Sequence, residues 1–243
     1  VLDEDSIPVT AFYVNSVLYE YVRLPFGHVQ AMQSFCSLMA ILCHGYDPAC
    51  YYADDLIIST KDDPNKSEQE LFKQHLADIE GMLDRIIDSN LKLSAHKCQW
   101  AFSSSRPMDW LGFTLADNLL RPQEAKIKAI REFPRPTTAK QTISFVSLAS
   151  FYRRFIKNFA KIAQPLYDVG KLTKKEPFVW TPEAEKAFLD LKDALCSDSI
   201  LRLPRQGEPF IVYTDASWGS LGCVLCQIDP IDKKPHPCAY GSR

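Results

Sequence analysis

Alternating apolar and polar positions divide the first part of the chain into short strands and a helix. Residues 7–14 and 17–24 are rich in β-branched and aromatic side chains and flank Asn15-Ser16, which predicts a hairpin. Proline and glycine in segment 25–27 then break the strand pattern. Apolar residues at helical spacing follow in 30–42. This helix is expected to bury Met32, Phe35, Met39 and Leu42.

A second helix and further strands follow in the same way. Ser67-Glu68-Gln69-Glu70 is a capping box, which predicts a helix that continues to about residue 89. Short strands are predicted at 91–93, 97–102 and 109–115. Two strands, a helix, two strands, a helix and again strands, joined by short hairpins, indicate an α+β fold. Its antiparallel sheet would carry helices on one face.

The pattern becomes helical after residue 121. One helix is predicted from 122 to about 133, where prolines end it, and a second capping box at 138–141 begins another. Thr181-Pro182 is expected to begin a third amphipathic helix, with proline at the first helical position. Residues 210–243 return to strand-like runs.

Two adjacent carboxylates interrupt the apolar run between residues 50 and 60. The flanking segments are expected to form a strand pair, with a tight turn at Ala53-Asp54-Asp55. Like charges this close disfavour joint ionisation unless a cation neutralises them, and Mg²⁺ is such a cation. The alternative is a solvated acidic turn, because acidic residues are mostly exposed in any protein.

Charge is distributed unevenly along the 243 residues, although the net charge is only -2. Residues 121–175 hold 13 Lys and Arg against 3 Asp and Glu, whereas residues 1–120 hold 8 against 17. A basic helical segment is the electrostatic footprint of nucleic-acid binding. The alternative is a helix bundle with an ordinary solvated Lys and Arg surface.

Composition excludes two other classes of protein. The chain is 46% hydrophobic and 12% aromatic, which fits a folded core and not a disordered chain. It has no apolar run long enough to cross a membrane, so no membrane partner is expected. Its eight cysteines lie mostly inside apolar runs and are expected to be reduced thiols of an intracellular protein. Because it begins with Val1, the chain is expected to be a piece of a longer protein.

Seven motifs occur in order along nearly the whole chain, and together they resemble the pol polyprotein of gypsy-type LTR retrotransposons. They are Leu24-Pro25-Phe26-Gly27, Tyr52-Ala53-Asp54-Asp55, the stretch from Leu93 to Cys98, Leu111-Gly112-Phe113, the stretch from Phe151 to Phe159, Trp180-Thr181, and Tyr213-Thr214-Asp215-Ala216-Ser217. The resemblance covers a reverse transcriptase and the start of a ribonuclease H region. It implies a palm with partial fingers at 1–121, a basic helical thumb at 122–176, and a linker helix with part of a ribonuclease H-like α/β unit at 177–243.

The resemblance also implies roles for single residues of the polymerase. Asp54 and Asp55 would be catalytic carboxylates that hold Mg²⁺ or Mn²⁺, with Asp54 the first choice as direct ligand. Lys97 would lie near the triphosphate. The alternative, given equal weight, is that Lys97 is simply an exposed lysine of a hairpin. The expected nucleotide-binding residues are Phe26, Gly27 and Tyr52, and the expected primer grip is Trp110, Leu111 and Gly112.

The thumb and the last strands receive implied roles too. The residues expected to contact the duplex are Lys126, Arg131, Lys140, Ser147, Arg153, Arg154 and Lys157. Asp215 resembles the first metal-binding carboxylate of ribonuclease H. Three positions depart from the family pattern, namely Met32, Cys36 and Ser147, and suggest a diverged or decaying copy.

The implied function is RNA-directed DNA polymerisation by two-metal nucleotidyl transfer, with two ions in the complete enzyme. The implied partners are an RNA or DNA template with its primer, deoxynucleoside triphosphates, and the remainder of the polyprotein, in the cytoplasm, virus-like particles or nucleus. The alternative is a catalytically inactive remnant that binds nucleic acid through the basic thumb. A nuclease centred on Asp215 is a weaker alternative. The third polymerase carboxylate and the next ribonuclease H carboxylate are expected outside residues 1–243, so the chain as given is expected to catalyse neither reaction.

Overall fold

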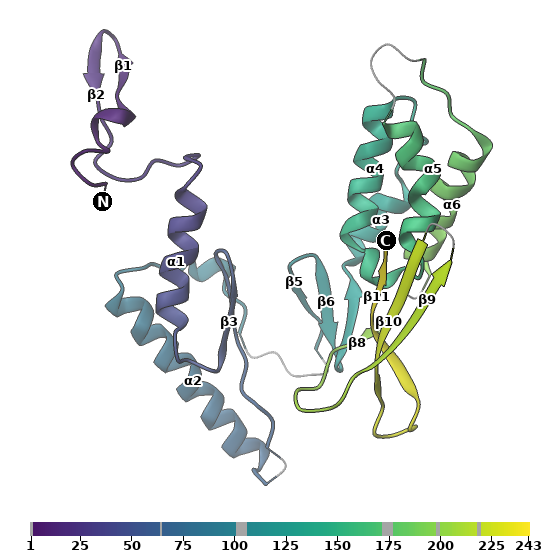
Figure 1. Ribbon diagram of the computed structural model, residues 1–243. Coiled ribbons are helices and arrows are strands. Elements are labelled where there is room, and N and C mark those ends of the chain that lie inside the picture. Colours follow the sequence, from purple (N-terminus) through teal and green to yellow (C-terminus); the bar gives the residue numbers. More distant parts are fainter. Residues whose placement is uncertain (1, 64, 101–105, 172–176, 198–199, 218–219) are drawn as a thin grey trace. The chain divides into compact units, whose positions relative to one another are not determined.

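The computed structural model describes residues 2–63, 65–100, 106–171, 177–197, 200–217 and 220–243. The chain divides into two compact units, residues 1–98 and 99–243 (Figure 1). Helices and antiparallel strands alternate in both units, which confirms the predicted α+β class. The three-part division at 121/122 and 176/177 stays a prediction.

The first unit begins with the predicted hairpin, which is shorter than expected. β1 (Phe12–Val14) pairs with β2 (Val17–Tyr19). Asn15 and Ser16 both have positive φ, as the two-residue turns favoured in hairpins require. The prediction of a strand from residue 7 was wrong, because Pro8–Thr10 forms a 3₁₀ turn, η1. Proline cannot donate to a strand ladder, so it favours this turn at the start of the segment.

Two helices cover the second hairpin of this unit. They are α1 (Ala31–Cys43) and α2 (Glu68–Asp88), and the hairpin strands are β3 (Ala49–Tyr52) and β4 (Asp55–Ile58). The predicted capping box is confirmed, since the Ser67 side chain accepts from the Glu70 N–H and the Glu70 carboxylate accepts from the Ser67 N–H. The buried core consists of Met39, Leu42, Met82 and Ile86.

Two further predictions for this unit were wrong. Met32 is 60% exposed, because it lies in the first turn of α1, before the helix reaches the core. The expected strands at 91–93 and 97–102 are absent from the described residues up to 100, where the chain forms the 3₁₀ turn η2 (Ala95–Lys97) instead. Local backbone bonds from Lys97 to Ser94 and from Cys98 to Ala95 replace a strand ladder there. Residues 101–102 lie outside the described residues.

A four-stranded antiparallel sheet begins the second unit. Its order is β5 (Met108–Trp110), β6 (Phe113–Ala116), β7 (Leu119–Pro122) and β8 (Leu201–Arg202). Positive φ angles at Leu111 and Gly112, and again at Asp117 and Asn118, make both hairpin turns. The helices of this unit lie in sequence between β7 and β8. The helical segment is therefore an insertion between the third and fourth strands of this sheet.

The helical segment consists of α3 (Glu124–Arg131), α4 (Ala139–Phe151), the 3₁₀ turn η3 (Arg153–Phe155), α5 (Phe159–Gly170) and α6 (Pro182–Cys196). Thr181 caps α6 by accepting from the Ala184 N–H, with Pro182 first in the helix, as predicted. Thr138 likewise caps α4, but the Gln141 side chain bonds Thr137 and not Thr138, so the predicted capping box is only half formed. The largest buried side chains here include Phe145, Tyr152, Phe159, Leu166 and Leu191.

A three-stranded meander ends the chain. Its strands are β9 (Ile211–Ser217), β10 (Ser220–Ile228) and β11 (Pro235–Ser242), in the order β11-β10-β9. A bulge between Leu225 and Cys226 shifts the register of β10 against β11. Among the described residues, no helix has the length and apolar character needed to cross a membrane.

Two leucines of α6 test where the core of the second unit lies. Leu191 is fully buried, whereas Leu189 is 48% exposed. Leu191→Ala should reduce the free energy of unfolding by about 2–5 kcal/mol, because it leaves a cavity in a packed core. Leu189→Ala makes the same chemical change with a loss of about 1 kcal/mol or less. Urea unfolding of both variants measures this difference, and equal losses would contradict the packing of α6.

Candidate functional site

The paired acids lie at the tip of the β3–β4 hairpin. Tyr52 pairs with Asp55, so the connection is the two residues Ala53 and Asp54. Ala53 has φ +52°, the sign required at the first central position of a type II′ turn. The expected three-residue turn is thus shorter by one residue, because Asp55 already belongs to β4.

Strand alternation presents the acids away from the core. Four hairpin residues pack on the core between α1 and α2: Ala49, Tyr51, Leu56 and Ile58. Cys50, Tyr52, Asp55 and Ile57 alternate with them and therefore lie on the opposite face. Asp54 and Asp55 are both exposed, and Tyr52 is 64% exposed. Their oxygen atoms are the hard ligands that a divalent ion such as Mg²⁺ prefers, so the donor chemistry fits one side of such a site.

The loop before α1 holds the expected nucleotide-binding pair. Phe26 is fully exposed. Gly27 has φ +83°, and a Cβ added there would meet no atom within 4 Å. Its backbone conformation, and not crowding, is therefore what favours glycine. Lys97 is exposed at the end of η2. The roles of these three residues stay predictions.

The expected primer grip is a tightly held turn in the second unit. The carbonyl of Gly112 accepts from the Tyr152 hydroxyl at 2.9 Å and from the Gln123 N–H at 3.0 Å. A Cβ at Gly112 would lie 3.1 Å from the Phe151 ring, so both space and its φ of +81° favour glycine. The Trp110 indole N–H is buried and has no hydrogen-bond partner among the described residues.

The expected duplex contacts divide into two groups. Lys126, Lys140, Ser147 and Lys157 are exposed on the helical segment. Arg131 is exposed but lies 4.0 Å from Glu124 in an ion pair. Arg153 donates to the carbonyl of Ser242, and the buried Nε of Arg154 has no partner among the described residues. Arg153 thus contacts the end of β11, while Arg154 is half-buried.

The remaining expected ligand, Asp215, lies in the edge strand β9 opposite Gly222 of β10, and it is exposed. The expected site residues thus fall in separate places. Tyr52, Asp54, Asp55, Phe26, Gly27 and Lys97 belong to the first unit, and the others belong to the second.

Sequence reasoning missed a polar cluster in the β10–β11 loop. Oxygen and nitrogen atoms of Asp229, Asp232 and His236 lie within 4.8 Å of one another. Arg202 of β8 pairs with the buried Asp229 carboxylate at 2.8 Å, and His236 pairs with Asp232 at 2.8 Å. The Ile231 N–H, with Arg202 beside it, holds the pKa of Asp229 below its ordinary value. The spacing of two acids and a histidine between predicted strands was the available signal.

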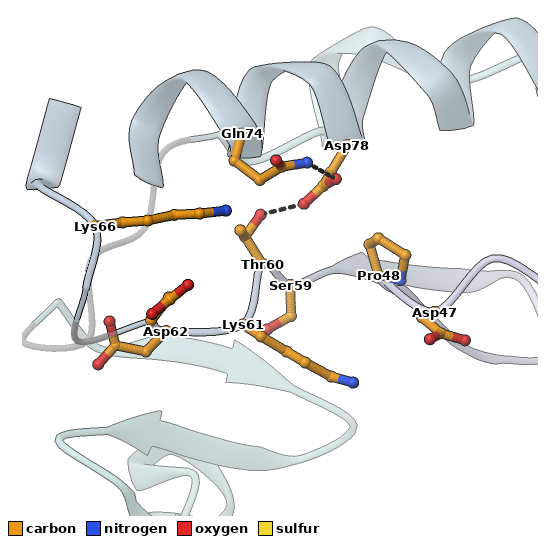
Figure 2. A pocket seen from close by; sticks show the side chains of 10 residues that line it. Asp47, Pro48, Ser59, Thr60, Lys61, Asp62, Lys66, Gln74 and Asp78 are labelled. Atoms are coloured by element: carbon orange, nitrogen blue, oxygen red, sulfur yellow. Dashed lines mark hydrogen bonds between the residues drawn. The ribbon is translucent and has the colours of Figure 1, made fainter. Parts of the chain in front are cut away.

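A second missed feature is a polar hollow of about 370 Å³ at the base of the β3–β4 hairpin (Figure 2). Asp78 of α2 is 9% exposed and accepts from the Thr60 hydroxyl at 2.6 Å and from the Gln74 amide at 3.0 Å. Because Thr60 follows β4 by two residues, these bonds tie the base of the hairpin to α2. The His75 ring also forms a hydrogen bond with the Thr60 hydroxyl, at 2.9 Å.

Comparison with known families gives two matches. Residues 2–115 match the family described as reverse transcriptase (RNA-dependent DNA polymerase), and residues 180–243 match the RNase H-like domain found in reverse transcriptase. The Pol polyprotein of transposon 412 from Drosophila melanogaster is 35% identical over the whole chain, which spans 18% of that relative. The Pol polyprotein of transposon gypsy from the same organism is 36% identical over 93% of the chain and 22% of its own length.

The fold is also similar to solved structures. The foamy viral protease-reverse transcriptase in complex with dsDNA matches with a TM-score of 0.81 and 22% identity, over 100% of this chain and 48% of that one. The same viral protein in complex with an RNA/DNA hybrid also gives 0.81, over 100% of this chain and 31% of that one. These comparisons confirm the predicted gypsy-type resemblance. The chain spans about a fifth of the curated relatives it matches.

The buried Tyr152, whose hydroxyl donates to the Gly112 carbonyl, makes the stability of the fold depend on pH. Burial raises the pKa of Tyr152 to about 12, whereas a tyrosine in an unfolded chain has a pKa of about 10. Between these values the folded state keeps a proton that the unfolded state loses, so the contribution of Tyr152 to stability falls as pH rises above about 10.

Tyr152→Phe removes both the hydroxyl and this titration. At neutral pH the variant should be less stable by about 1 kcal/mol, because the Gly112 carbonyl loses one donor. At about pH 11 the difference should shrink, since the unmodified chain has begun to lose stability. Urea unfolding of both proteins at the two pH values measures the difference. A gap that stays constant with pH would show that Tyr152 titrates normally.

Proposed function

We propose that this chain, which belongs to the reverse transcriptase family, forms part of an RNA-directed DNA polymerase that extends a primer on an RNA or DNA template. The observation that carries the proposal is the β3–β4 hairpin, whose register displays Asp54 and Asp55 beside Tyr52 within the matched residues 2–115. The activity of the whole protein is a proposal because the chain spans only about a fifth of its relatives. Similarity to Pol polyproteins supports the proposal that this chain acts inside the cell, together with the remainder of such a polyprotein.

Members of this family use divalent metal ions. In this chain Asp54 and Asp55 would hold Mg²⁺ or Mn²⁺ together with a further carboxylate from another segment of the longer protein. The ions would supply charge neutralisation and nucleophile activation in an in-line phosphoryl transfer. The contribution of the protein is to keep both acids on one exposed hairpin tip. The packed inner face of β3–β4 and the Asp78–Thr60 bond at its base support that role.

Other residues would orient the reactants. Phe26 and Gly27 would lie against the incoming deoxynucleoside triphosphate, and Lys97 would face its phosphates as a point charge. Leu111 and Gly112 would position the primer end. The hydrogen bond from the Tyr152 hydroxyl to the Gly112 carbonyl supports this role, because it fixes the β5–β6 turn against the end of α4.

The duplex would be held through its backbone. Lys126, Lys140 and Lys157 are exposed on the basic helical segment, and phosphate contacts carry no sequence information. A copying enzyme requires this kind of contact, because it must hold every sequence it has just made. Asp215 would be the first carboxylate of a ribonuclease H site that the longer protein completes.

Replacing one hairpin acid tests the catalytic assignment. In a longer protein that contains this chain, Asp54→Asn should reduce nucleotide addition at least about a hundredfold, because one oxygen ligand loses its charge. Binding of template-primer should persist. Asp117→Asn is the matched control, because Asp117 is an exposed acid in another hairpin turn.

Primer extension assays with Mg²⁺ measure both variants. Extension by Asp54→Asn at the rate of the parent would reject the assignment. Duplex binding without extension in the parent itself would favour the inactive remnant.

Charge removal on the helical segment tests the duplex grip. The logarithm of the binding constant should fall with the logarithm of salt concentration by about 0.9 for each phosphate contacted. Changing Lys126, Lys140 and Lys157 together to Gln should therefore reduce this slope by up to about 3. Lys186→Gln is the control, because the Lys186 ammonium is already paired with Asp190 at 2.5 Å. Fluorescence anisotropy across a salt series gives the slopes, and no slope in the parent would refute the grip.

A further inference from the structure

Arg153, which the sequence analysis expects to contact the duplex, also takes part in an interface within the second unit. Arg153, in η3, donates from its guanidinium to the backbone carbonyl of Ser242 at 2.5 Å. The same guanidinium carbon lies 5.7 Å from the centre of the Phe159 ring. Arg153 therefore joins η3 to the end of β11, and the two bonded residues are 89 positions apart in sequence.

Ser242 also completes the first turn of α5. The N-cap residue of this helix, Asn158, has φ +57° and makes no side-chain capping bond. The Ala160 N–H, one of the donors that a helix start leaves free, instead donates to the Ser242 hydroxyl at 2.9 Å. A residue from β11 thus supplies the cap that the local sequence does not.

A third contact brings β10 against the same turn. A Cβ added to Gly222 would lie 2.8 Å from the side-chain oxygen of Asn158, so the absence of a side chain permits this approach. Gly222 is the register partner of Asp215 in β9. The close approach therefore occurs in the strand segment that positions the expected nuclease carboxylate.

The meander is attached to the rest of the unit at other points. Tyr240 of β11 packs against the core formed by the helices. Near the opposite end of β10, the buried Asp229 carboxylate pairs with Arg202 of β8 at 2.8 Å. Attachment near both ends resists rotation of the sheet, which a single chain connection would allow.

We propose that Arg153, Ser242 and Gly222 form a clasp that fixes the β9–β11 meander to the helical segment as one body. These three are positioning residues. They keep Asp215 at a constant distance from the exposed lysines of that segment. The contact of those lysines with the duplex therefore also determines which position of the RNA strand lies next to Asp215. The catalytic consequence rests on the proposed function, whereas the clasp itself does not.

Hydrogen exchange of residues 1–243 tests the clasp without any catalysis. Ser242→Ala removes the cap, and Arg153→Met removes the donors while keeping an apolar stem. In both variants the amides of β9–β11 should exchange at least about tenfold faster, while those of α4 and α6 keep their protection, because only the docking of the meander is weakened. Ser242→Thr keeps the hydroxyl and should restore protection. Lys161→Met is the control, since Lys161 is an exposed cation of α5.

Two results would reject the clasp. One is unchanged exchange of β9–β11 in both variants. The other is an equal loss of protection throughout the unit, which would indicate general destabilisation.

The catalytic consequence needs a longer protein that contains this chain, extending a labelled primer on RNA. The distance from the primer end to the RNA cuts should be narrowly distributed in the parent and broad in Ser242→Ala, while primer extension is unchanged. Ser242→Thr should restore the narrow distribution. An unchanged distribution in a variant whose meander exchanges faster would overturn the positioning role. Absence of any RNA cutting would instead reject the nuclease part of the proposed function, and the exchange experiment would still decide the clasp.

Discussion

The second unit depends on one buried aromatic residue, Tyr152, at the point where α4 ends. Its ring packs edge-on against Phe113 and Phe151, and its hydroxyl donates to the Gly112 carbonyl. A buried hydroxyl without a partner would cost about 1–3 kcal/mol, so the ring can occupy this position only if the β5–β6 turn presents a carbonyl to it. Sheet and helices therefore constrain one another: the turn satisfies the tyrosine, and the tyrosine fixes the turn.

The first unit reaches its functional geometry through a different constraint. A two-stranded hairpin is marginal in water, and this one also carries two adjacent negative charges at its tip. Burial of its inner face against Met39 and Met82, with the Asp78–Thr60 bond at its base, offsets both costs. The stabilising contacts lie away from the acids, so the tip keeps the exposure to solvent that the proposed ion site requires.

Local signals predicted much of this fold, and long-range contacts explain what they missed. The capping box at Ser67 and the turn at Asn15-Ser16 depend on neighbours within four residues, which the sequence displays directly. Arg153 was expected to contact the duplex because it stands in a basic run, and that role stays a prediction. Its partner, Ser242, lies 89 residues later, and no periodicity announces such a contact. The acid pair was identifiable because charge inside an apolar run is conspicuous, but its relation to residues of the second unit is not a local property.

The basic segment shows why charge counts and binding surfaces differ. It holds 13 Lys and Arg, and those among them that the structure describes do not act alike. Arg135 pairs with Glu185 at 3.0 Å, Lys128 lies 3.9 Å from Glu132, and Arg153 serves the contact with β11. A cation already engaged by a carboxylate or carbonyl gains less from a phosphate, because it must give up an existing partner. In the proposed function the attraction to a duplex would therefore fall mainly to exposed lysines such as Lys126 and Lys157. Their flexible stems can follow any backbone, and their ammonium groups make no demand on sequence.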